Sequence, residues 1–235
     1  PIATQYCIAS DTSIQDDGHK LVTKIIRLKK STQNVRNEKY GYGNEGKKAK
    51  QKPERRIYMG LDMDLQSIQE VRDLIRDAKK AQEVFGTFDQ RQVDQIVKAI
   101  AEACAANAEP LAKMAVEETG FGVWQDKVLK NLLGSTITYE SIKDMKTIGV
   151  IHEDGAKGIM EVGVPMGVIA ALIPSTNPTS TVMYKTLIAL KAGNAIVISP
   201  HPGAKNCILE SVNVIQDAAR RAGAPEGLIG VIRLT

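Results

Sequence analysis

The sequence predicts an α/β protein in which N-terminal helices and a β-hairpin lead into an incomplete, Rossmann-like parallel sheet. Residues 167–205 alternate an apolar run, a polar loop, an amphipathic segment, a Gly-Asn stop and a second apolar run. This is the pattern of a β-α-β unit with a buried parallel sheet. The preceding region repeats apolar residues at helical spacing. With 235 residues and 43% hydrophobic side chains, the chain can bury such a core.

Residues 1–58 differ from the rest of the chain in charge. They carry a balance of +7, and the remaining residues carry −3. The segment is polar, with little apolar periodicity, which predicts disorder; a nucleic-acid arm is the weaker interpretation, because no aromatic residues are interleaved for base stacking. A third hypothesis is a non-native segment, since RRIY at 55–58 is what a translated bacterial ribosome-binding site would encode before a start at Met59. The expected organisation is therefore a basic segment, 1–58, and a folded part, 59–235.

Two helices are expected at the start of the folded part. The first should span about 65–85, with Ser67 and Glu70 spaced as a capping box. The second should open at Asp89, with Gln92 at the corresponding position. Its apolar stripe consists of Val93, Ile96, Val97, Ile100 and Cys104.

Two further helices follow. Pro110 can start a third helix, which Gly120 should end. A fourth should begin near Trp124, whose ring is expected to anchor the helix start in the core. The residues expected to face inward from this fourth helix are Val128, Leu129, Leu132 and Leu133.

A hairpin and three parallel strands should complete the chain. The stretch 147–163 contains two β-like runs around the turn-forming residues 153–155, with His152 expected to be exposed. The parallel part is expected in this order: a strand at 168–173, a helix at 180–191 capped by Thr179, a strand at 195–199, a helix at 204–221 and a strand from Leu228.

The three cysteines and the lack of long apolar runs indicate the compartment. Cys7, Cys104 and Cys207 are far apart and odd in number, which suits a reducing compartment and argues against a disulfide framework or a zinc site. No apolar run is long enough for a membrane span and the N-terminus does not read as a signal peptide, so a cytoplasmic protein is expected. Cys104 and Cys207 are interpreted as packing residues.

The loops after the first two parallel strands are the candidate binding region, because ligands of such sheets lie beyond the carboxyl ends of the strands. Neither loop contains a G-x-G-x-x-G or a Walker motif. Each leads into a helix N-terminus, where free amides favour an anion or a developing oxyanion. The pair is a weak indication of a nucleotide-sized anionic ligand.

Four long sequence motifs follow one another along the folded part: LAKMAVEETGFG at 111–122, DKVLKN at 126–131, IPSTNPTSTVMYKTLIALKAGNAIVISPHPGAK from 173, and AGAPEGLIG at 222–230. Through these motifs the sequence from about residue 64 to 232 resembles the CoA-acylating acetaldehyde dehydrogenases of the aldehyde dehydrogenase superfamily. This group includes the aldehyde dehydrogenase half of the bifunctional aldehyde-alcohol dehydrogenases and enzymes associated with bacterial microcompartments. The resemblance implies NAD as cofactor, coenzyme A as co-substrate and a short aldehyde, most simply acetaldehyde, as substrate.

The resemblance also implies roles for residues of the two loops. Asn177 would be an amide donor to the oxyanion, and His201 is a weaker candidate for a general base. The residues implied to bind the cofactor are Ile173, Pro174, Ser175 and Thr176 on the nicotinamide side, and Ser199, His201 and Pro202 near the adenosine. The resemblance further implies a homo-oligomer, for which the hairpin at 147–163 offers an open edge, and an association with a microcompartment is an option that it leaves open.

The chain departs from the family in its cysteine and its last residues. The family's nucleophilic cysteine belongs to a catalytic domain for which this chain has no matching motif, and residues 233–235 leave the family pattern, which suggests a truncated or frameshifted reading frame. The chain is therefore expected to be an inactive N-terminal fragment. The alternative is a non-catalytic nucleotide-binding or assembly module. The sequence does not distinguish acetaldehyde from propionaldehyde or a sulfonated aldehyde.

Overall fold

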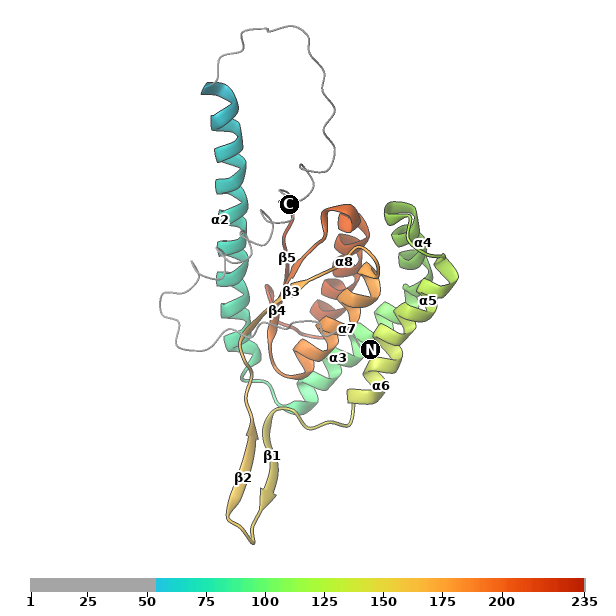
Figure 1. The fold of residues 1–235 in the computed structure, drawn as a ribbon. Coiled ribbons are helices and arrows are strands. Elements are labelled where there is room, and N and C mark those ends of the chain that lie inside the picture. The colour runs from blue at the N-terminus through green and yellow to red at the C-terminus, as the bar shows by residue number, and fades with distance from the viewer. Residues whose placement is uncertain (1–53, 235) are drawn as a thin grey trace, which may run out of the picture. The chain divides into compact units, whose positions relative to one another are not determined.

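The computed structural model describes residues 54–234, which divide into two units (Figure 1). The larger unit comprises residues 74–233, and the smaller one includes residues 54–73 and Leu234. The expectation of disorder or a non-native origin for 1–58 falls mostly on residues outside this range. Within it, helix α2 runs from Glu54 to Phe85, so the expected helix start at about 65 is wrong.

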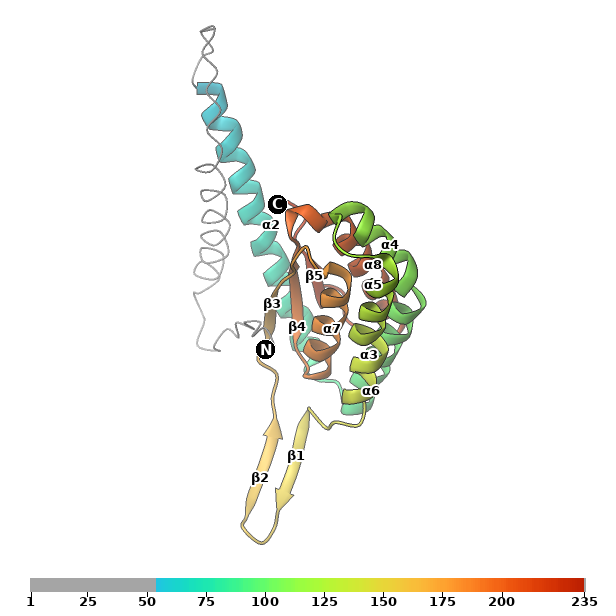
Figure 2. The same ribbon diagram turned by 45° about the vertical axis from the view of Figure 1, so that its right-hand side comes forward.

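A three-stranded parallel sheet forms the centre of the larger unit. Its strands are β3 (Val168–Leu172), β4 (Ala195–Ser199) and β5 (Ile229–Val231), in the order β3-β4-β5. Helices α7 (Pro178–Lys191) and α8 (Lys205–Arg221) connect them on one face, and residues 74–85 of α2 lie on the other (Figures 1 and 2). Every residue of β4 is buried, as both of its faces are covered. The predicted Rossmann-like sheet is confirmed.

An outer layer of helices packs on α7 and α8 (Figure 2). These helices are α3 (Gln90–Ala106), α4 (Ala108–Thr119), α5 (Trp124–Leu132) and α6 (Thr138–Ile142), with a π-helical turn, η1 (Leu133–Ile137), between the last two. The predicted capping box of α3 is present, because the Asp89 carboxylate accepts from Gln92 N and the Gln92 amide oxygen accepts from Asp89 N. All five predicted stripe residues of α3 are buried.

The fourth predicted helix exists as α5, but the prediction of its inward face is wrong for two of the four residues, whereas Val128 and Leu132 are half-buried. Leu129 is 66% exposed and Leu133 57%, whereas Lys127 and Asn131 are buried. The lysine and asparagine face inward because carbonyl and hydroxyl groups there form hydrogen bonds with them, as described below. Trp124 begins α5 and is half-buried, with the Lys113 ammonium 4.7 Å from the ring centroid.

The helix caps of the parallel part also correct one prediction. Asn177, and not Thr179, stands at the N-cap of α7, since Pro178 already occupies the first helical position. A short 3-10 turn, η2 (Pro202–Ala204), precedes α8.

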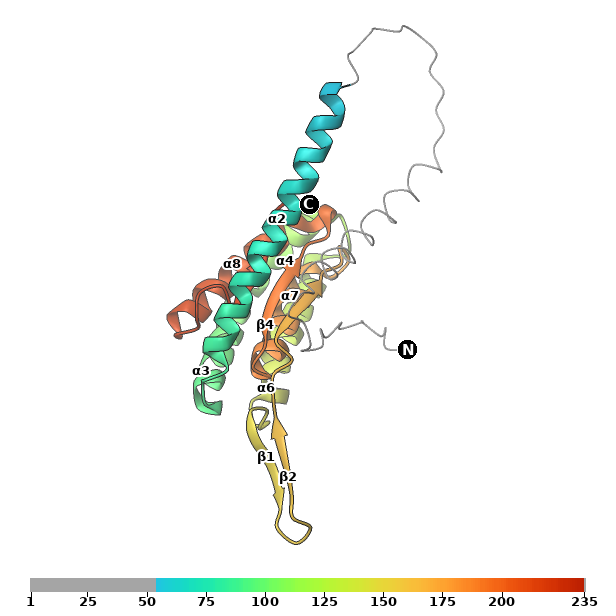
Figure 3. The same ribbon diagram turned by 90° about the vertical axis from the view of Figure 1, so that its left-hand side faces the viewer.

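The hairpin consists of β1 (Gly149–Asp154) and β2 (Ile159–Gly163), paired antiparallel. It projects away from the helices and the parallel sheet in all three views (Figures 1 to 3). Its base is fixed by Thr147, whose N–H donates to the Gln90 side-chain oxygen at 2.8 Å and whose hydroxyl donates to the Lys191 carbonyl. His152 is exposed, as predicted.

In the smaller unit, the predicted capping box of Ser67 and Glu70 is wrong. Because α2 continues through these positions, their backbone amides are already part of the helix ladder. The two side chains bind Leu234 instead: Ser67 Oγ donates to its carbonyl at 3.2 Å, and Glu70 Oε2 accepts from its N–H at 2.8 Å. Among the residues that the structure describes, no helix has both the length and the apolar character needed to cross a membrane.

Candidate functional site

The carboxyl ends of β3 and β4 bring the two candidate loops to one edge of the sheet. Parallel pairing aligns Leu172 with Ser199. One step beyond, the Ile173 N–H donates to the Ser199 carbonyl at 3.0 Å, so the first loop starts from a fixed position. The residues of this loop become progressively more exposed, from buried Ile173 through half-buried Pro174 and Ser175 to exposed Thr176.

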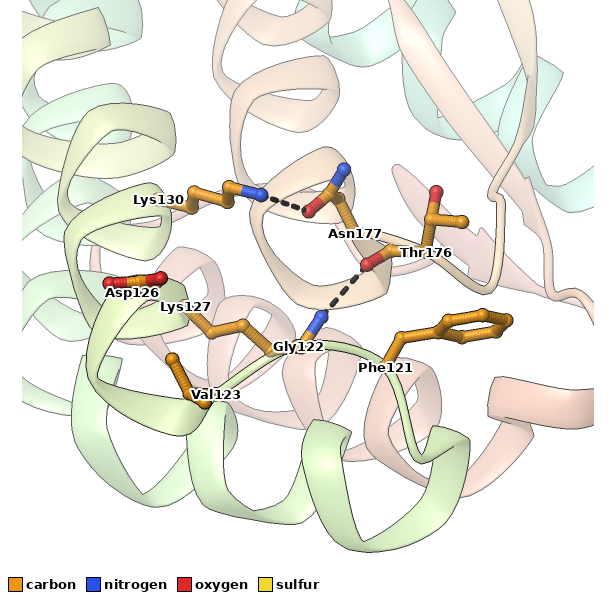
Figure 4. A pocket seen from close by; sticks show the side chains of 8 residues that line it. All are labelled: Phe121, Gly122, Val123, Asp126, Lys127, Lys130, Thr176 and Asn177. Atoms are coloured by element: carbon orange, nitrogen blue, oxygen red, sulfur yellow. Dashed lines mark hydrogen bonds between the residues drawn. The ribbon is translucent and has the colours of Figure 1, made fainter.

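A cavity of about 180 Å³ opens where this loop meets α5 (Figure 4). It lies between the loop end and the start of α5, with the Phe121 ring on one side. Its lining residues are Phe121, Gly122, Val123, Asp126, Lys127, Lys130, Thr176 and Asn177. Of the residues predicted from the sequence, the cavity therefore brings together Thr176 and Asn177.

Lys127 holds the backbone of the loop. Its side chain is almost fully buried, 5% exposed, and Nζ donates to the Thr176 carbonyl at 2.8 Å. Burial lowers the pKa of this ammonium, and the nearby charge of Lys130 lowers it further. The contact fixes the peptide that immediately precedes Asn177.

Lys130 holds the side chain of Asn177. Its Nζ donates to Asn177 Oδ1 at 3.0 Å (Figure 4), so the carbonyl half of the amide faces the ammonium. The Asn177 side chain makes no capping bond to α7. Because Oδ1 is the half of the amide that binds Lys130, Nδ2 is the half that can donate a hydrogen bond.

Behind the cavity, a buried polar network joins α5 to α7. Asn131 Nδ2 donates to the Ala108 carbonyl at 2.8 Å, and Asn131 Oδ1 accepts from Thr179 Oγ1 at 2.7 Å. Each polar group here has a partner, so the burial of Asn131 carries no desolvation penalty for an unpaired amide. Next to it, Gly134 lies so close to α7 that an added Cβ would stand 2.7 Å from the Ser180 carbonyl oxygen.

The second loop lies outside this cavity. Ser199 is buried, whereas His201 and Pro202 are exposed, and His201 Nδ1 accepts from Gly203 N at 3.0 Å. The first amides of α8 are bound as well: Asn206 N donates to one oxygen of the Glu118 carboxylate at 2.8 Å and Cys207 N to the other at 2.7 Å.

Both described cysteines are packing residues, as predicted. Cys104 and Cys207 are fully buried, and burial raises the pKa of each thiol to about 12. For Cys207, interaction with the Glu118 carboxylate acts in the same direction. In the part of the chain that the structure describes, no group of three or more His, Cys, Asp or Glu side chains is arranged to hold a metal ion.

Sequence reasoning missed Lys127, Lys130 and Glu118. The two lysines were hidden by neighbouring leucines that suggested a different inward face. The available signal was the spacing of the lysines: three positions apart on a helix, they can reach the same loop. Nothing in the sequence alone indicated the partner of Glu118, which lies 88 residues further along the chain.

Comparison with known proteins identifies one family. A model described as "Aldehyde dehydrogenase family" matches residues 60–234. Over 170 residues, or 72% of its length, the chain is 45% identical to the bifunctional aldehyde-alcohol dehydrogenase AdhE of Escherichia coli K12. Over 162 residues it is 41% identical to the acetylating succinate-semialdehyde dehydrogenase of Clostridium kluyveri. The chain spans 19% of the first relative and 36% of the second.

Solved structures show the same similarity. A probable aldehyde dehydrogenase from Listeria monocytogenes EGD-e is 61% identical and superimposes with a TM-score of 0.72, covering 73% of this chain and 38% of that one. A propionaldehyde dehydrogenase from a Clostridium phytofermentans microcompartment is 34% identical, with a TM-score of 0.59 and coverage of 68% and 36%. Two neighbours at 30% identity were solved with ligands: a Rhodopseudomonas palustris propionaldehyde dehydrogenase with CoA, and an engineered glycolyl-CoA reductase with NADP+. Their TM-scores are 0.59 and 0.58, and each superposition covers 68% of this chain and 36% of the neighbour's chain.

Proposed function

Because the chain belongs to the aldehyde dehydrogenase family, we propose that it forms the N-terminal, NAD-binding part of a CoA-acylating aldehyde dehydrogenase. The intact protein would oxidise a short aldehyde, acetaldehyde in the first instance, to its acyl-CoA. The proposal for the whole reaction draws on relatives of which this chain spans 19% to 38%. The observation that carries it is the Asn177 amide, held by Lys130 at the carboxyl edge of a parallel sheet.

The two loops fit a dinucleotide cofactor. They lie side by side at the strand ends, where nucleotides bind in open α/β sheets, and the cofactor-side candidates span both loops. In this assignment Ile173, Pro174, Ser175 and Thr176 contact the nicotinamide half; Ser199, His201 and Pro202 contact the adenosine half. Bound NAD would supply the hydride acceptor, and coenzyme A the thiol that takes up the acyl group.

Asn177 is assigned the role of oxyanion donor. Attack on an aldehyde converts its carbonyl oxygen into an anion, which a preorganised N–H donor stabilises. With Oδ1 bound to Lys130, Nδ2 is directed as the donor, and the Lys127 bond to Thr176 keeps the loop in place. The two cationic side chains would also add positive potential at the site of the developing charge.

The nucleophile is assigned to the part of the relatives' length that this chain does not match. The buried thiols of Cys104 and Cys207, with their pKa values near 12, are unsuited to attack a carbonyl at neutral pH. The chain alone is thus expected to bind nucleotide without turning over aldehyde.

The proposed assembly is a homo-oligomer formed through the hairpin. Its edges are open and its apolar side chains are exposed, among them Ile151 (43%), Met160 (55%) and Val162 (52%). A two-stranded ribbon of this kind is marginal in water without a partner surface. The proposed setting is the cytoplasm, with a bacterial microcompartment as the second option, because one neighbour comes from such a compartment.

Two experiments test the proposal, and the first uses the chain alone. Calorimetric titration should detect NAD+ binding to the chain, while NADH absorbance should show no turnover with acetaldehyde and coenzyme A. CoA-dependent turnover by the chain would contradict the assignment of the nucleophile, and absence of nucleotide binding would contradict the role of the sheet. A purely non-catalytic module would also bind nucleotide without activity. A second experiment therefore has to distinguish such a module from a part of an enzyme.

The second experiment uses a fusion of the chain to the C-terminal remainder of the Listeria monocytogenes relative. We expect the fusion to form NADH from acetaldehyde only when coenzyme A is present. Asn177→Ala in the fusion should lower kcat by about 10²- to 10³-fold, the usual loss for one oxyanion donor. A fusion that folds and binds NAD+ but shows no activity would favour the non-catalytic module.

A further inference from the structure

We infer that Glu118 is a specificity-determining residue of the proposed nucleotide site, disfavouring a phosphate at the adenosine ribose so that NAD binds in preference to NADP. The inference rests on the nucleotide-binding role proposed above and deepens it. It starts from the contact between α4 and α8, which pack against each other in the larger unit (Figures 1 and 2).

The amino end of α8 would normally attract an anion. The helix has 17 residues, and its first amides carry no intrahelical partner. In this protein two of these amides are already occupied: Asn206 N and Cys207 N donate to the two oxygens of the Glu118 carboxylate, at 2.8 and 2.7 Å. A phosphate could use these donors only by displacing a negatively charged group.

The position of Glu118 is unfavourable for its own helix. It lies in the last turn of α4, where the helix dipole disfavours negative charge. The adjacent Glu117 is exposed, whereas Glu118 is half-buried against α8. The bidentate contact with α8 compensates for this placement, so the carboxylate is fixed at the end of the second βα loop.

This loop is where the adenosine ribose of a dinucleotide should lie. In nucleotide-binding βαβ units, the ribose meets the end of the second strand, and an acidic residue there favours the 2′-hydroxyl over the 2′-phosphate. The second strand is β4, and the stretch from Ser199 to Lys205 contains no carboxylate of its own. Glu118 supplies one from α4.

The same loop contains groups that would attract a phosphate if the Glu118 carboxylate were absent. Lys205 is the first residue of α8, and His201 lies exposed four residues earlier. Removing the charge of Glu118 would leave these groups together with a freed amide, since a glutamine offers one acceptor oxygen where the carboxylate offers two. The site would then become more favourable for a 2′-phosphate.

The experiment compares NAD+ and NADP+ binding to the complete chain by calorimetry, with Glu118→Gln, Glu118→Asp and the matched control Glu117→Gln. Wild type should bind NAD+ more tightly than NADP+. Glu118→Gln should reduce that preference by about fivefold or more, as expected for loss of one close charge repulsion. Glu118→Asp, which keeps the charge, and Glu117→Gln, which removes a charge from the exposed neighbour, should retain the preference.

The ratio of the two affinities distinguishes selection from simple helix support. If Glu118→Gln weakens both nucleotides equally, or leaves the ratio unchanged, Glu118 only holds α8 and the inference fails. Should that variant not fold, wild type still provides a test: its preference for NAD+ must narrow as KCl rises from about 0.02 to 0.5 M, because salt screens the repulsion, and an unchanged ratio would overturn the inference. Failure of wild type to bind either nucleotide would instead refute the proposed site itself, and this inference with it.

Discussion

At the scale of single residues, burial decides the chemistry of the thiols and of one lysine. Cys104 and Cys207 are inside the helical layer, where a thiolate would be poorly solvated. Burial also disfavours the charged form of Lys127, which is the ammonium, and therefore lowers its pKa. The lysine is retained in this position by its bond to the Thr176 carbonyl.

The first prediction concerns thiol reactivity. A thiol with a pKa of about 12 is ionised in roughly one molecule in 10⁴ at about pH 8. In a Cys7→Ser chain, which removes a cysteine outside the described residues, a thiol-reactive disulfide should therefore label neither Cys104 nor Cys207 within minutes. Both should react after denaturation in guanidinium. Rapid labelling of the folded chain would contradict the assignment of these residues to packing.

The second prediction concerns the pH dependence of stability. The pKa of Lys127 is lowered in the folded state, so between that pKa and the unfolded value near 10.5 the unfolded chain binds more protons. Stability contributed by this residue therefore rises with pH in that window. The free energy of unfolding of wild type minus that of Lys127→Met should increase as pH rises toward 10.5.

Lys79→Met is the control for this comparison, because Lys79 is an exposed lysine of α2. Denaturant titrations at a series of pH values give both differences. A wild-type advantage over Lys127→Met that falls with rising pH would show that burial does not control this ammonium.

At the scale of elements, the contact of η1 with α7 sets the position of the first loop. Gly134 allows the π-helical turn to approach Ser180, and π-helical turns of this kind often accompany functional sites. Helix α5, which leads directly into η1, carries both the Asn131–Thr179 bond and the Lys130–Asn177 bond. Displacement of η1 would therefore be transmitted to Asn177.

The third prediction tests this contact. Gly134→Ala places a Cβ 2.7 Å from the Ser180 carbonyl oxygen, which requires the two elements to separate. The free energy of unfolding should fall by about 1–3 kcal/mol, typical of overpacking, and NAD+ affinity should fall with it. Gly155→Ala in the hairpin turn, where nothing lies within 4 Å of an added Cβ, should change stability by less than about 0.5 kcal/mol. Equal stability of the two variants would argue against a tight contact between η1 and α7.

At the scale of the whole molecule, two groups of exposed apolar side chains among the described residues bear on assembly. One is the hairpin, with Val150, Ile159 and Met160 among its exposed side chains; the other is the outer face of α5 and η1, with Leu129, Leu133 and Ile137. Clustered apolar exposure of this kind marks interaction surfaces. The open edges of the hairpin make it the surface assigned to self-association.

The fourth prediction separates the two surfaces. Met160→Lys with Val162→Lys adds two charges to side chains that are 55% and 52% exposed, so the monomer should remain folded. Analytical ultracentrifugation should show a shift from oligomer to monomer. Leu129→Lys is the matched control on α5 and should leave the oligomer intact. Dissociation by Leu129→Lys alone would transfer self-association to α5.

The sequence by itself determined the elements whose signals are local. The alternation of apolar strand, polar loop and amphipathic helix, the Asp89–Gln92 capping box and the Gly193 stop, which has a φ of 76°, all depend on residues within a few positions of one another. The sequence motifs of the two loops and α4 likewise identified the family. For these features, local backbone preference and the buried face agree.

Only the tertiary structure decided which face of α5 is buried and what the polar side chains bind. Lys127 and Asn131 face inward because the Thr176 carbonyl and the Thr179 hydroxyl lie there, partners 49 and 48 residues away. Ser67 and Glu70 have the spacing of a cap, yet the continuing helix leaves their side chains to bind Leu234. Periodicity records where apolar residues fall along a helix, but the partner that satisfies a buried charge is chosen by distant parts of the chain that folding brings together.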